Sequence, residues 1–411
     1  MNQLLERLLG EASRLTRSGR LREATAAIQN ALRLAGQGAP AVHAPDRTPG
    51  PFGPTAPTPQ ATPTGAALVI DVEAREVPSS PEADPAPTAP AAPPMPAPEA
   101  AAEAPAGVGQ FIEGRYADTH GQRDYKLYLP PGSGAQPLPL VVMLHGCTQN
   151  PDDFAAGTRM NEAACTQRFI VLYPAQPSSA NPGGCWNWFK HNHQRRDAGE
   201  PALLAGMVRE VMSRHAVDPA RVYVAGLSAG GAMAAILGDA YPDLFAAVGV
   251  HSGLATGAAT DMTTAFAAMR NGSADPASLP LRGMRAGARV EAGRTGADGL
   301  APPTIVFHGA RDTTVNPANG EHVVQACIAA VGASGEPASM TENHTVNNGR
   351  TTHQRLYRDA AGHVRAEHWL VGDTGHAWSG GSAKGSFADE RGPDATQEML
   401  RFFLSRRLAG R

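Results

Sequence analysis

One serine stands in a glycine-rich turn between a predicted strand and a predicted helix. Residues 221–225 form a short apolar run, residues 226–230 read Gly-Leu-Ser-Ala-Gly, and residues 232–237 favour a helix. A serine on such a turn projects its hydroxyl above a sheet, while the glycines let the backbone pack closely. The N-terminus of the following helix favours developing negative charge. This context predicts that Ser228 is a nucleophile; the alternative is an ordinary glycine-rich strand-to-helix turn.

A serine nucleophile needs a general base, and the base needs a carboxylate that holds it in one tautomer. Asp312 follows the predicted strand 304–307, and His376 follows the predicted strand 367–371. Catalytic groups of open α/β sheets gather at the carboxyl ends of strands, and the chain order serine, aspartate, histidine is that of α/β-hydrolases. We therefore predict a triad of Ser228, Asp312 and His376. The alternative for Asp312 is a turn or helix-cap residue.

The negative charge that develops during such a reaction needs two backbone N–H donors, which together form an oxyanion hole. One donor is usually the residue after the nucleophile, here Ala229, and the second comes from a loop after an earlier strand. The apolar run 140–144 leads into His145, Gly146 and Cys147. The predicted second donor is therefore Cys147 N–H, and the alternative for this loop is a simple turn.

These groups need a sheet to position them, and the pattern after residue 106 supplies one. Short apolar runs alternate with longer helical stretches, which is typical of a mostly parallel sheet covered by helices. The predicted strands are 125–129, 140–144, 169–173, 221–225, 246–250, 304–307, 354–357 and 367–371, and the predicted helices are 201–215, 229–240 and a final one. The final helix begins at Asp394 with a capping-box pattern that includes Gln397, and ends near Leu408. The fold class is α/β, an α/β-hydrolase with a mostly parallel central sheet.

The chain before this sheet divides into two parts. Apolar residues recur at helical spacing within residues 1–36, which predicts a helical hairpin. Residues 37–106 hold half of the chain's 36 prolines among Ala and Thr, a composition that cannot bury enough apolar surface to fold. We therefore predict a hairpin (1–36), a disordered Pro/Ala-rich linker (37–106) and a catalytic domain (107–411). The hairpin is interpreted as a self-association or granule-docking element, the alternative being a solvated helix.

Charge and composition exclude several classes of partner. The formal net charge is -3 and clustered positive charge is lacking, so no nucleic-acid partner is expected. No apolar run approaches the ~18 residues of a membrane span, and the N-terminus lacks a secretory pattern. The sequence therefore favours the cytoplasm. Four cysteines without zinc-ligand spacing predict neither a disulfide scaffold nor a metal site.

The segments around these residues resemble the polyhydroxybutyrate (PHB) depolymerase family of esterases. The resemblance extends from about Gly107 to Leu408 and rests on these motifs: Leu144-His145-Gly146-Cys147-Thr148-Gln149, Cys185-Trp186-Asn187-Trp188-Phe189, Gly226-Leu227-Ser228-Ala229-Gly230-Gly231, His308-Gly309 followed by Asp312, and Gly375-His376-Ala377-Trp378-Ser379-Gly380-Gly381. It implies hydrolysis of ester bonds in short-chain hydroxyalkanoate polymers or oligomers, with Ser228, Asp312 and His376 as the triad and without metal or organic cofactor. Since many members are secreted, it also implies an extracellular alternative for the location.

Two further groups of residues lie in these motifs. Trp186, Trp188 and Trp378 offer large apolar ring faces to a substrate, the equally weighted alternative being core packing. Cys147 and Cys185 each lie in a loop expected at the rim of the site. We hypothesise a bridge between them that braces the oxyanion donor, provided that the compartment is oxidising.

Two other functions remain open from the sequence. A feruloyl or acetylxylan esterase would share the fold and the triad and differ mainly in pocket shape. A non-catalytic granule-associated or scaffold protein would instead use the hairpin and the Pro-rich linker. The complete set of Ser228, Asp312 and His376 argues against a purely structural role.

Overall fold

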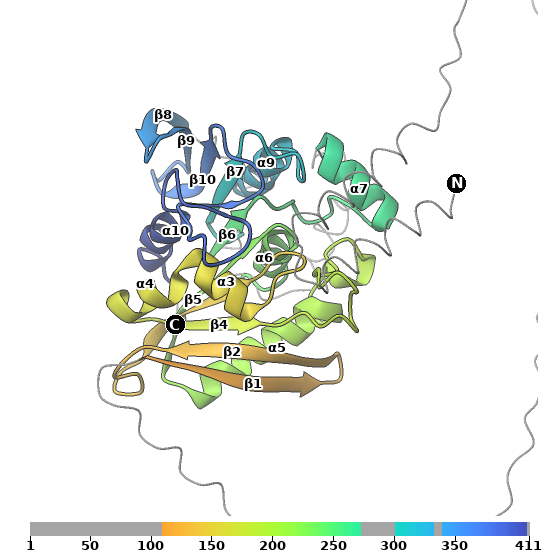
Figure 1. Ribbon diagram of the computed structural model, residues 1–411, viewed down its shortest axis with the longest axis vertical. Coiled ribbons are helices and arrows are strands. Elements are labelled where there is room, and N and C mark those ends of the chain that lie inside the picture. Colours follow the sequence, from red (N-terminus) through yellow and green to blue (C-terminus); the bar gives the residue numbers. More distant parts are fainter. Residues whose placement is uncertain (1–108, 273–300, 333–338, 409–411) are drawn as a thin grey trace, which may run out of the picture. The chain divides into compact units, whose positions relative to one another are not determined.

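The large sheet dominates the part of the chain that the structure describes. The structure is a computed structural model and describes residues 109–272, 301–332 and 339–408; the predicted hairpin (1–36) and linker (37–106) lie outside the described residues. The ten-stranded sheet has the order β1-β2-β4-β3-β5-β6-β7-β10-β9-β8. The six central strands from β4 to β10 are parallel, and antiparallel pairs close both edges (Figure 1). The predicted α/β class and mostly parallel sheet are confirmed.

The strands have the following bounds, in spatial order across the sheet: β1 Gln110–Asp118, β2 Gly121–Leu129, β4 Ile170–Pro174, β3 Leu138–Leu144, β5 Val217–Leu227, β6 Ala247–His251, β7 Thr304–Gly309, β10 Val364–Val371, β9 Arg350–Arg358 and β8 Ser339–Asn347. A separate short pair joins β11 (Trp378–Ser379) to β12 (Ala388–Asp389). The central strands β3, β4, β6 and β7 are buried along their whole length. Strands that are covered on both faces need such continuous apolar runs.

Helices cover both faces of this sheet (Figure 1). One apolar layer contains side chains of α5 (Gly199–Arg214), α6 (Ala229–Ala240), α7 (Met262–Asn271) and α9 (Ala318–Gly332). The other contains side chains of α3 (Pro151–Thr158), α4 (Met160–Gln167) and α10 (Ala395–Leu404). A short 3-10 helix, η1 (His191–His193), precedes α5.

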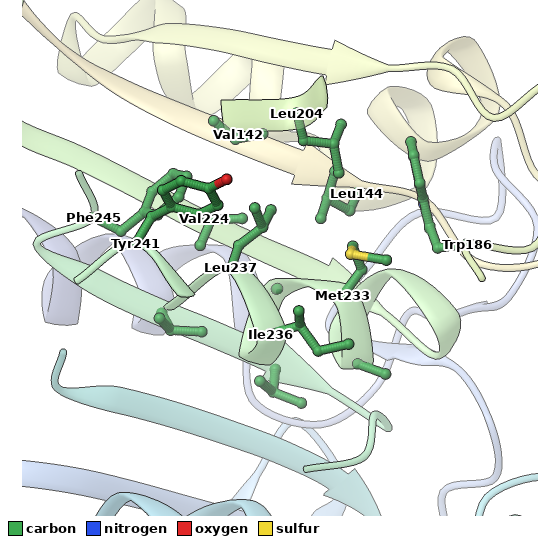
Figure 2. Close-up of a cluster of buried hydrophobic side chains, with 14 of the residues drawn as sticks. Val142, Leu144, Trp186, Leu204, Val224, Met233, Ile236, Leu237, Tyr241 and Phe245 are labelled. Carbon is green, nitrogen blue, oxygen red and sulfur yellow. The ribbon is translucent and has the colours of Figure 1, made fainter. Parts of the chain in front are cut away.

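The first of these layers is closely filled by branched and aromatic side chains. Figure 2 shows Val142 of β3 and Val224 of β5 in the same cluster as Leu204 of α5 and Leu237 of α6. All four are fully buried. Burying an aliphatic side chain of this size contributes about 2 kcal/mol, so this layer holds α5 and α6 firmly against the sheet.

All eight strands predicted from the sequence are present, but two edge strands were not predicted. In β8, eight of nine residues are exposed, and β1 alternates between exposed and half-buried positions. A strand at the edge of a sheet buries little apolar surface, so its sequence contains no apolar run that would indicate it. The prediction also lacked α3, α4, α7 and α9, which are present in the structure.

The final helix begins where it was predicted to begin, but it lacks the predicted capping box and ends earlier. The Asp394 carboxylate accepts from Gln397 N–H at 3.0 Å, so the N-cap is confirmed. The Gln397 side chain instead accepts from Gln167 Nε2 at 2.8 Å, so it does not complete a capping box. The helix ends at Leu404 and not at Leu408, because Leu408 N–H donates to the Ala220 carbonyl of β5.

Within residues 109–272, 301–332 and 339–408, no helix is long and apolar enough to cross a membrane.

Candidate active site

Ser228 lies in a strained turn between β5 and α6. Its backbone angles are φ 57° and ψ -119°, a region that residues with a side chain rarely adopt. A Cβ on Gly226 would lie 2.3 Å from the Gly230 carbonyl carbon, and a Cβ on Gly230 would lie 2.0 Å from the Leu144 oxygen. Only glycine fits at either position. The strand-turn-helix context predicted from the sequence is therefore present, and it places Ser228 directly after the carboxyl end of β5.

Asp312 and His376 are brought together from loops that are 64 residues apart in the chain. His376 Nδ1 lies 2.7 Å from Asp312 Oδ2. Because the ionised carboxylate only accepts, the Nδ1 atom carries the proton and donates it, which leaves Nε2 as the basic nitrogen. The other carboxylate oxygen, Oδ1, accepts from Thr314 N–H and Val315 N–H at 2.9 Å each. The arrangement is that of a carboxylate that orients a general base.

A second histidine contacts the Asp312 carboxylate and favours its ionised form. His308 Nε2 lies 3.4 Å from Asp312 Oδ2 and also 2.9 Å from the Val315 carbonyl. Burial alone would raise the pKa of Asp312, but contacts with His308 and His376 outweigh it and hold that pKa well below its usual range. Asp312 is therefore ionised at neutral pH.

The loop that carries His376 is fastened to the end of β7. Arg311 N–H donates to the Thr374 carbonyl at 2.9 Å, and Ala310 N–H donates to the Val371 carbonyl at 2.8 Å. A Cβ on Gly309 would lie only 2.3 Å from the Gly375 oxygen, so the two loops touch backbone to backbone. This contact fixes the distance between the acid and the base without relying on side-chain packing.

His251, at the end of β6, was not predicted as part of the site. Its carbonyl accepts from Ser228 N–H at 2.8 Å, and its ring Nε2 accepts from Ser379 N–H at 3.0 Å. Burial, together with the nearby rings of His308 and His376, holds the pKa of His251 well below its usual range, so the ring stays neutral and can accept. His251 therefore joins the nucleophile turn to the loop of His376.

A sequence signal for His251 did exist. It is the first polar residue after the apolar run 246–250, at the same carboxyl edge as the other candidates. The ring also stacks on Trp378 and Phe307, with centroids 5.0 and 5.7 Å away. Its hydrogen bonds could not be read from the chain, because they join residues 23 positions (Ser228) and 128 positions (Ser379) away in the sequence.

The predicted oxyanion loop lies directly against Ser228. A Cβ on Gly146 would be 3.6 Å from the Ser228 Cβ atom. The Gly146 N–H is already occupied by Gln149 Oε1 at 2.9 Å. Within the described residues, neither Cys147 N–H nor Ala229 N–H has a hydrogen-bond acceptor. Both amides are thus available to a ligand atom beside Ser228.

A disulfide and a buried histidine hold this loop in place. Cys147 and Cys185 form a disulfide with Cα atoms 4.2 Å apart, so the hypothesised bridge is present. His145 accepts from Trp186 Nε1 through its carbonyl at 3.0 Å and from Gln176 N–H through its ring Nε2 at 3.1 Å. Burial lowers the pKa of His145, which keeps that ring neutral and able to accept.

Glu200 anchors the segment on the other side of the disulfide. Its carboxylate is 2 % exposed and accepts from Gln176 Nε2 at 2.5 Å and from Asn187 N–H at 2.7 Å. Burial opposes its ionisation, but a contact with His193 and hydrogen bonds from Gln176 and Asn187 outweigh this and lower the pKa of Glu200. A buried, fully bonded charge of this kind fixes the loop that carries Cys185.

Burial separates the two interpretations of the tryptophans. The exposed fractions are 0 % for Trp186, 5 % for Trp188 and 1 % for Trp378. Trp186 appears within the core cluster in Figure 2, and Trp378 Nε1 donates to Thr396 Oγ1 in the opposite layer. None of the three presents a free ring face to a substrate, so the structure favours core packing over the substrate-binding role. The three rings belong to the packed layers on the two faces of the sheet.

Comparison with known proteins gives a family for the part of the chain that holds two of the three predicted triad residues. The family model described as "Esterase PHB depolymerase" matches residues 123–336, a span that includes Ser228 and Asp312. His376 lies beyond this span and is placed beside Asp312 by the fold.

Three curated proteins illustrate the range of similar sequences. Poly(3-hydroxyalkanoate) depolymerase C of Paucimonas lemoignei is 37% identical over 48% of this chain and 46% of its own length. Feruloyl esterase B of Thermothelomyces thermophilus is 31% identical over 48% of this chain and 67% of its own. A probable acetylxylan esterase A of Aspergillus clavatus is 29% identical over 62% of this chain and 82% of its own. The match thus spans about half the length of the first of these relatives.

Among solved structures, an acetyl xylan esterase from Aspergillus awamori matches 64% of this chain and 94% of its own, with 23% identity and a TM-score of 0.50. At that identity the likeness supports the fold alone, and the fold agrees with the α/β-hydrolase prediction.

Proposed function

Because the chain belongs to the esterase PHB depolymerase family, we propose that it is a serine carboxylic ester hydrolase whose substrates are short-chain poly(3-hydroxyalkanoate) polymers or oligomers. The observation that carries this proposal is the 2.7 Å contact between His376 Nδ1 and Asp312 Oδ2, in a loop that His251 joins to the strained turn of Ser228. A structural role would require neither the strained serine nor the buried, ionised carboxylate.

The geometry supports an acyl-enzyme route. His376 Nε2 takes the hydroxyl proton as Ser228 Oγ forms a bond to the ester carbonyl carbon. The amides of Cys147 and Ala229 hold the oxyanion, and Asp312 stabilises the imidazolium. The tetrahedral adduct collapses, its alkoxide leaves with the proton from His376, and an acyl-serine remains. Water then repeats both proton transfers, which releases the hydroxy acid and restores the serine.

The disulfide supports one of the two locations expected from the sequence. Disulfides persist in oxidising compartments and are rare where glutathione and thioredoxin keep thiols reduced. The Cys147–Cys185 bridge therefore favours the extracellular alternative over the cytoplasm.

A second candidate substrate class is a feruloyl or acetyl ester of a plant polysaccharide. It is favoured by the similarity to feruloyl esterase B and to the acetylxylan esterases. These matches cover larger fractions of the relatives' own lengths than the match to the depolymerase does. The two classes use the same triad and differ in the groups around the acyl and leaving-group sites.

The experiment that separates them is a substrate panel with the purified full chain. It compares kcat/KM for 3-hydroxybutyrate oligomers, methyl ferulate, acetylated xylan and p-nitrophenyl esters of increasing acyl length, with Ser228→Ala as the blank. We expect the hydroxybutyrate oligomers to give the highest kcat/KM. A preference for ferulate or acetylxylan would replace the substrate class, and no Ser228-dependent hydrolysis of any ester would overturn the proposed activity.

A further inference from the structure

The hairpin of β8 and β9 carries a group of ligand-type side chains that the proposed ester hydrolysis does not use. The two strands pair antiparallel, with His344 opposite His353 and Glu342 opposite Arg355. Residues two apart on a strand share a face, and directly opposed residues of an antiparallel pair are neighbours. Glu342, His344 and His353 therefore project from the same face of the hairpin.

The ligand atoms of these three side chains converge. Glu342 Oε1 lies 3.6 Å from His344 Nε2 and 3.8 Å from His353 Nδ1. The two imidazole rings lie edge to face, with centroids 4.2 Å apart. All three ligand atoms lie within 4.8 Å of one another. Ligand atoms of a tetrahedral zinc ion, bound at about 2.1 Å, are about 3.4 Å apart, so small side-chain rotations would complete the geometry.

We propose that Glu342, His344 and His353 form a binding site for a divalent transition-metal cation such as zinc, with water as the remaining ligand. Two neutral imidazole nitrogens and one carboxylate oxygen are a donor set that suits zinc, copper and nickel. The side chains of His344 and His353 are 61% and 44% exposed, so an ion reaches them directly from solvent. This site is independent of the proposed ester hydrolysis.

The positive charge of Arg355 competes with a bound metal ion for the Glu342 carboxylate. Arg355 Nε lies 3.2 Å from Glu342 Oε1, and Arg355 also contacts Glu321 Oε2 through Nη1 at 3.4 Å. A bound cation must share Glu342 with this guanidinium, and this lowers the affinity of the site for the cation. Glu321 gives Arg355 a second partner when Glu342 turns towards the ion. Removing the guanidinium should therefore strengthen metal binding.

A metal ion bound at this site would stabilise β8, the least buried strand of the sheet. Eight of the nine residues in β8 are exposed, and among the described residues β8 pairs only with β9, at the edge of the sheet. Such an edge strand opens easily because few apolar contacts hold it. A metal ion held by residues from both strands would tie β8 to β9, and β9 is paired with β10. Metal binding should therefore slow amide exchange along β8.

The test uses tag-free full-length protein, stripped with EDTA and titrated with zinc chloride by calorimetry. We expect a saturable site that the double variant His344→Gln/His353→Gln weakens by at least about tenfold. Arg355→Gln should bind zinc more tightly than wild type. The matched control is His363→Gln, since His363 is another exposed histidine, 77% exposed and 3.6 Å from the Asp359 carboxylate. This control should bind like wild type.

Hydrogen exchange gives a second readout that does not depend on activity. Zinc should slow exchange of the β8 amides in wild type and in His363→Gln, but not in the double variant. Wild type without saturable zinc binding would overturn the proposal, as would a double variant that binds zinc as tightly as wild type. Zinc binding without any change in the exchange of β8 amides would overturn the clamping of β8.

Discussion

Two groups of histidines in this chain show how burial decides what an imidazole can do. Around Asp312, His308 and His376 are at most 10% exposed at their side chains and share one carboxylate. On the β8–β9 hairpin, His344 and His353 also share one carboxylate, Glu342, but their side chains are 61% and 44% exposed to water. In the buried group the shared carboxylate faces one nitrogen of each ring, which suits proton transfer. The exposed rings can turn, which suits capture of an ion from solvent.

The largest expected effect comes from removing the nucleophile. Ser228→Ala should lower kcat by about 10⁴-fold or more, because the covalent route is lost and only the oxyanion donors remain. The measurement is hydrolysis of p-nitrophenyl butyrate by a variant whose circular dichroism and melting temperature match wild type. Folded Ser228→Ala protein with substantial turnover would show that the buried group is not the catalytic one.

His251 tests whether the buried group depends on a neutral acceptor. His251→Leu should lower kcat by about ten- to hundredfold with little change in KM, because the loop of His376 loses its hydrogen bond from Ser379 N–H. His251→Gln keeps an acceptor at a similar distance and should recover most of the rate. Equal losses in both variants would show that the ring acts only by filling space against Trp378 and Phe307.

Reduction of the disulfide should have a smaller effect. Breaking the Cys147–Cys185 bridge loosens the oxyanion loop, so kcat should fall severalfold while KM changes less. The check is steady-state kinetics before and after reduction, with free thiols counted by mass spectrometry and Cys165→Ser as the control for an unpaired cysteine. Unchanged kcat with two demonstrably free thiols would show that the bridge does not support the chemistry.

The smallest expected effect is on stability at acid pH. The pKa of Asp312 is depressed in the folded state, so its contribution to stability is fully present above its unfolded pKa of about 4 and is lost as the pH falls below that value. Asp312→Asn lacks this contribution. Between about pH 4 and pH 2.5 the unfolding free energy of wild type should therefore fall more steeply than that of Asp312→Asn, as measured by urea titration. Parallel curves would mean that Asp312 is not strongly paired.

The sequence predicted those features that depend on local pattern. The turn of Ser228 was predictable because strand, glycine turn and helix follow one another directly. The central strands were predictable because burial on both faces requires apolar runs. The order of the triad residues in the chain then selected Asp312 and His376, and the structure places these two in contact.

The remaining features depend on contacts between distant parts of the chain. Trp186, Trp188 and Trp378 have the same side chain whether they line a pocket or fill a core, and only the packed layers decide between the two. His251 was missed because its partners Ser228 and Ser379 come from two other loops. The edge strand β8 was missed because an exposed strand needs no apolar residues.

The disulfide has a topological consequence beyond the oxyanion loop. Its two cysteines are 38 residues apart, and the ring that they close contains α3, α4 and β4. A protease that cuts once between residues 148 and 184 would therefore open the ring but leave both fragments covalently joined. On a gel run without reductant such a nicked chain would migrate as one band, and with reductant as two. Damage to this part of the surface would thus leave the loop of Cys147 attached to the segment that carries Ser228.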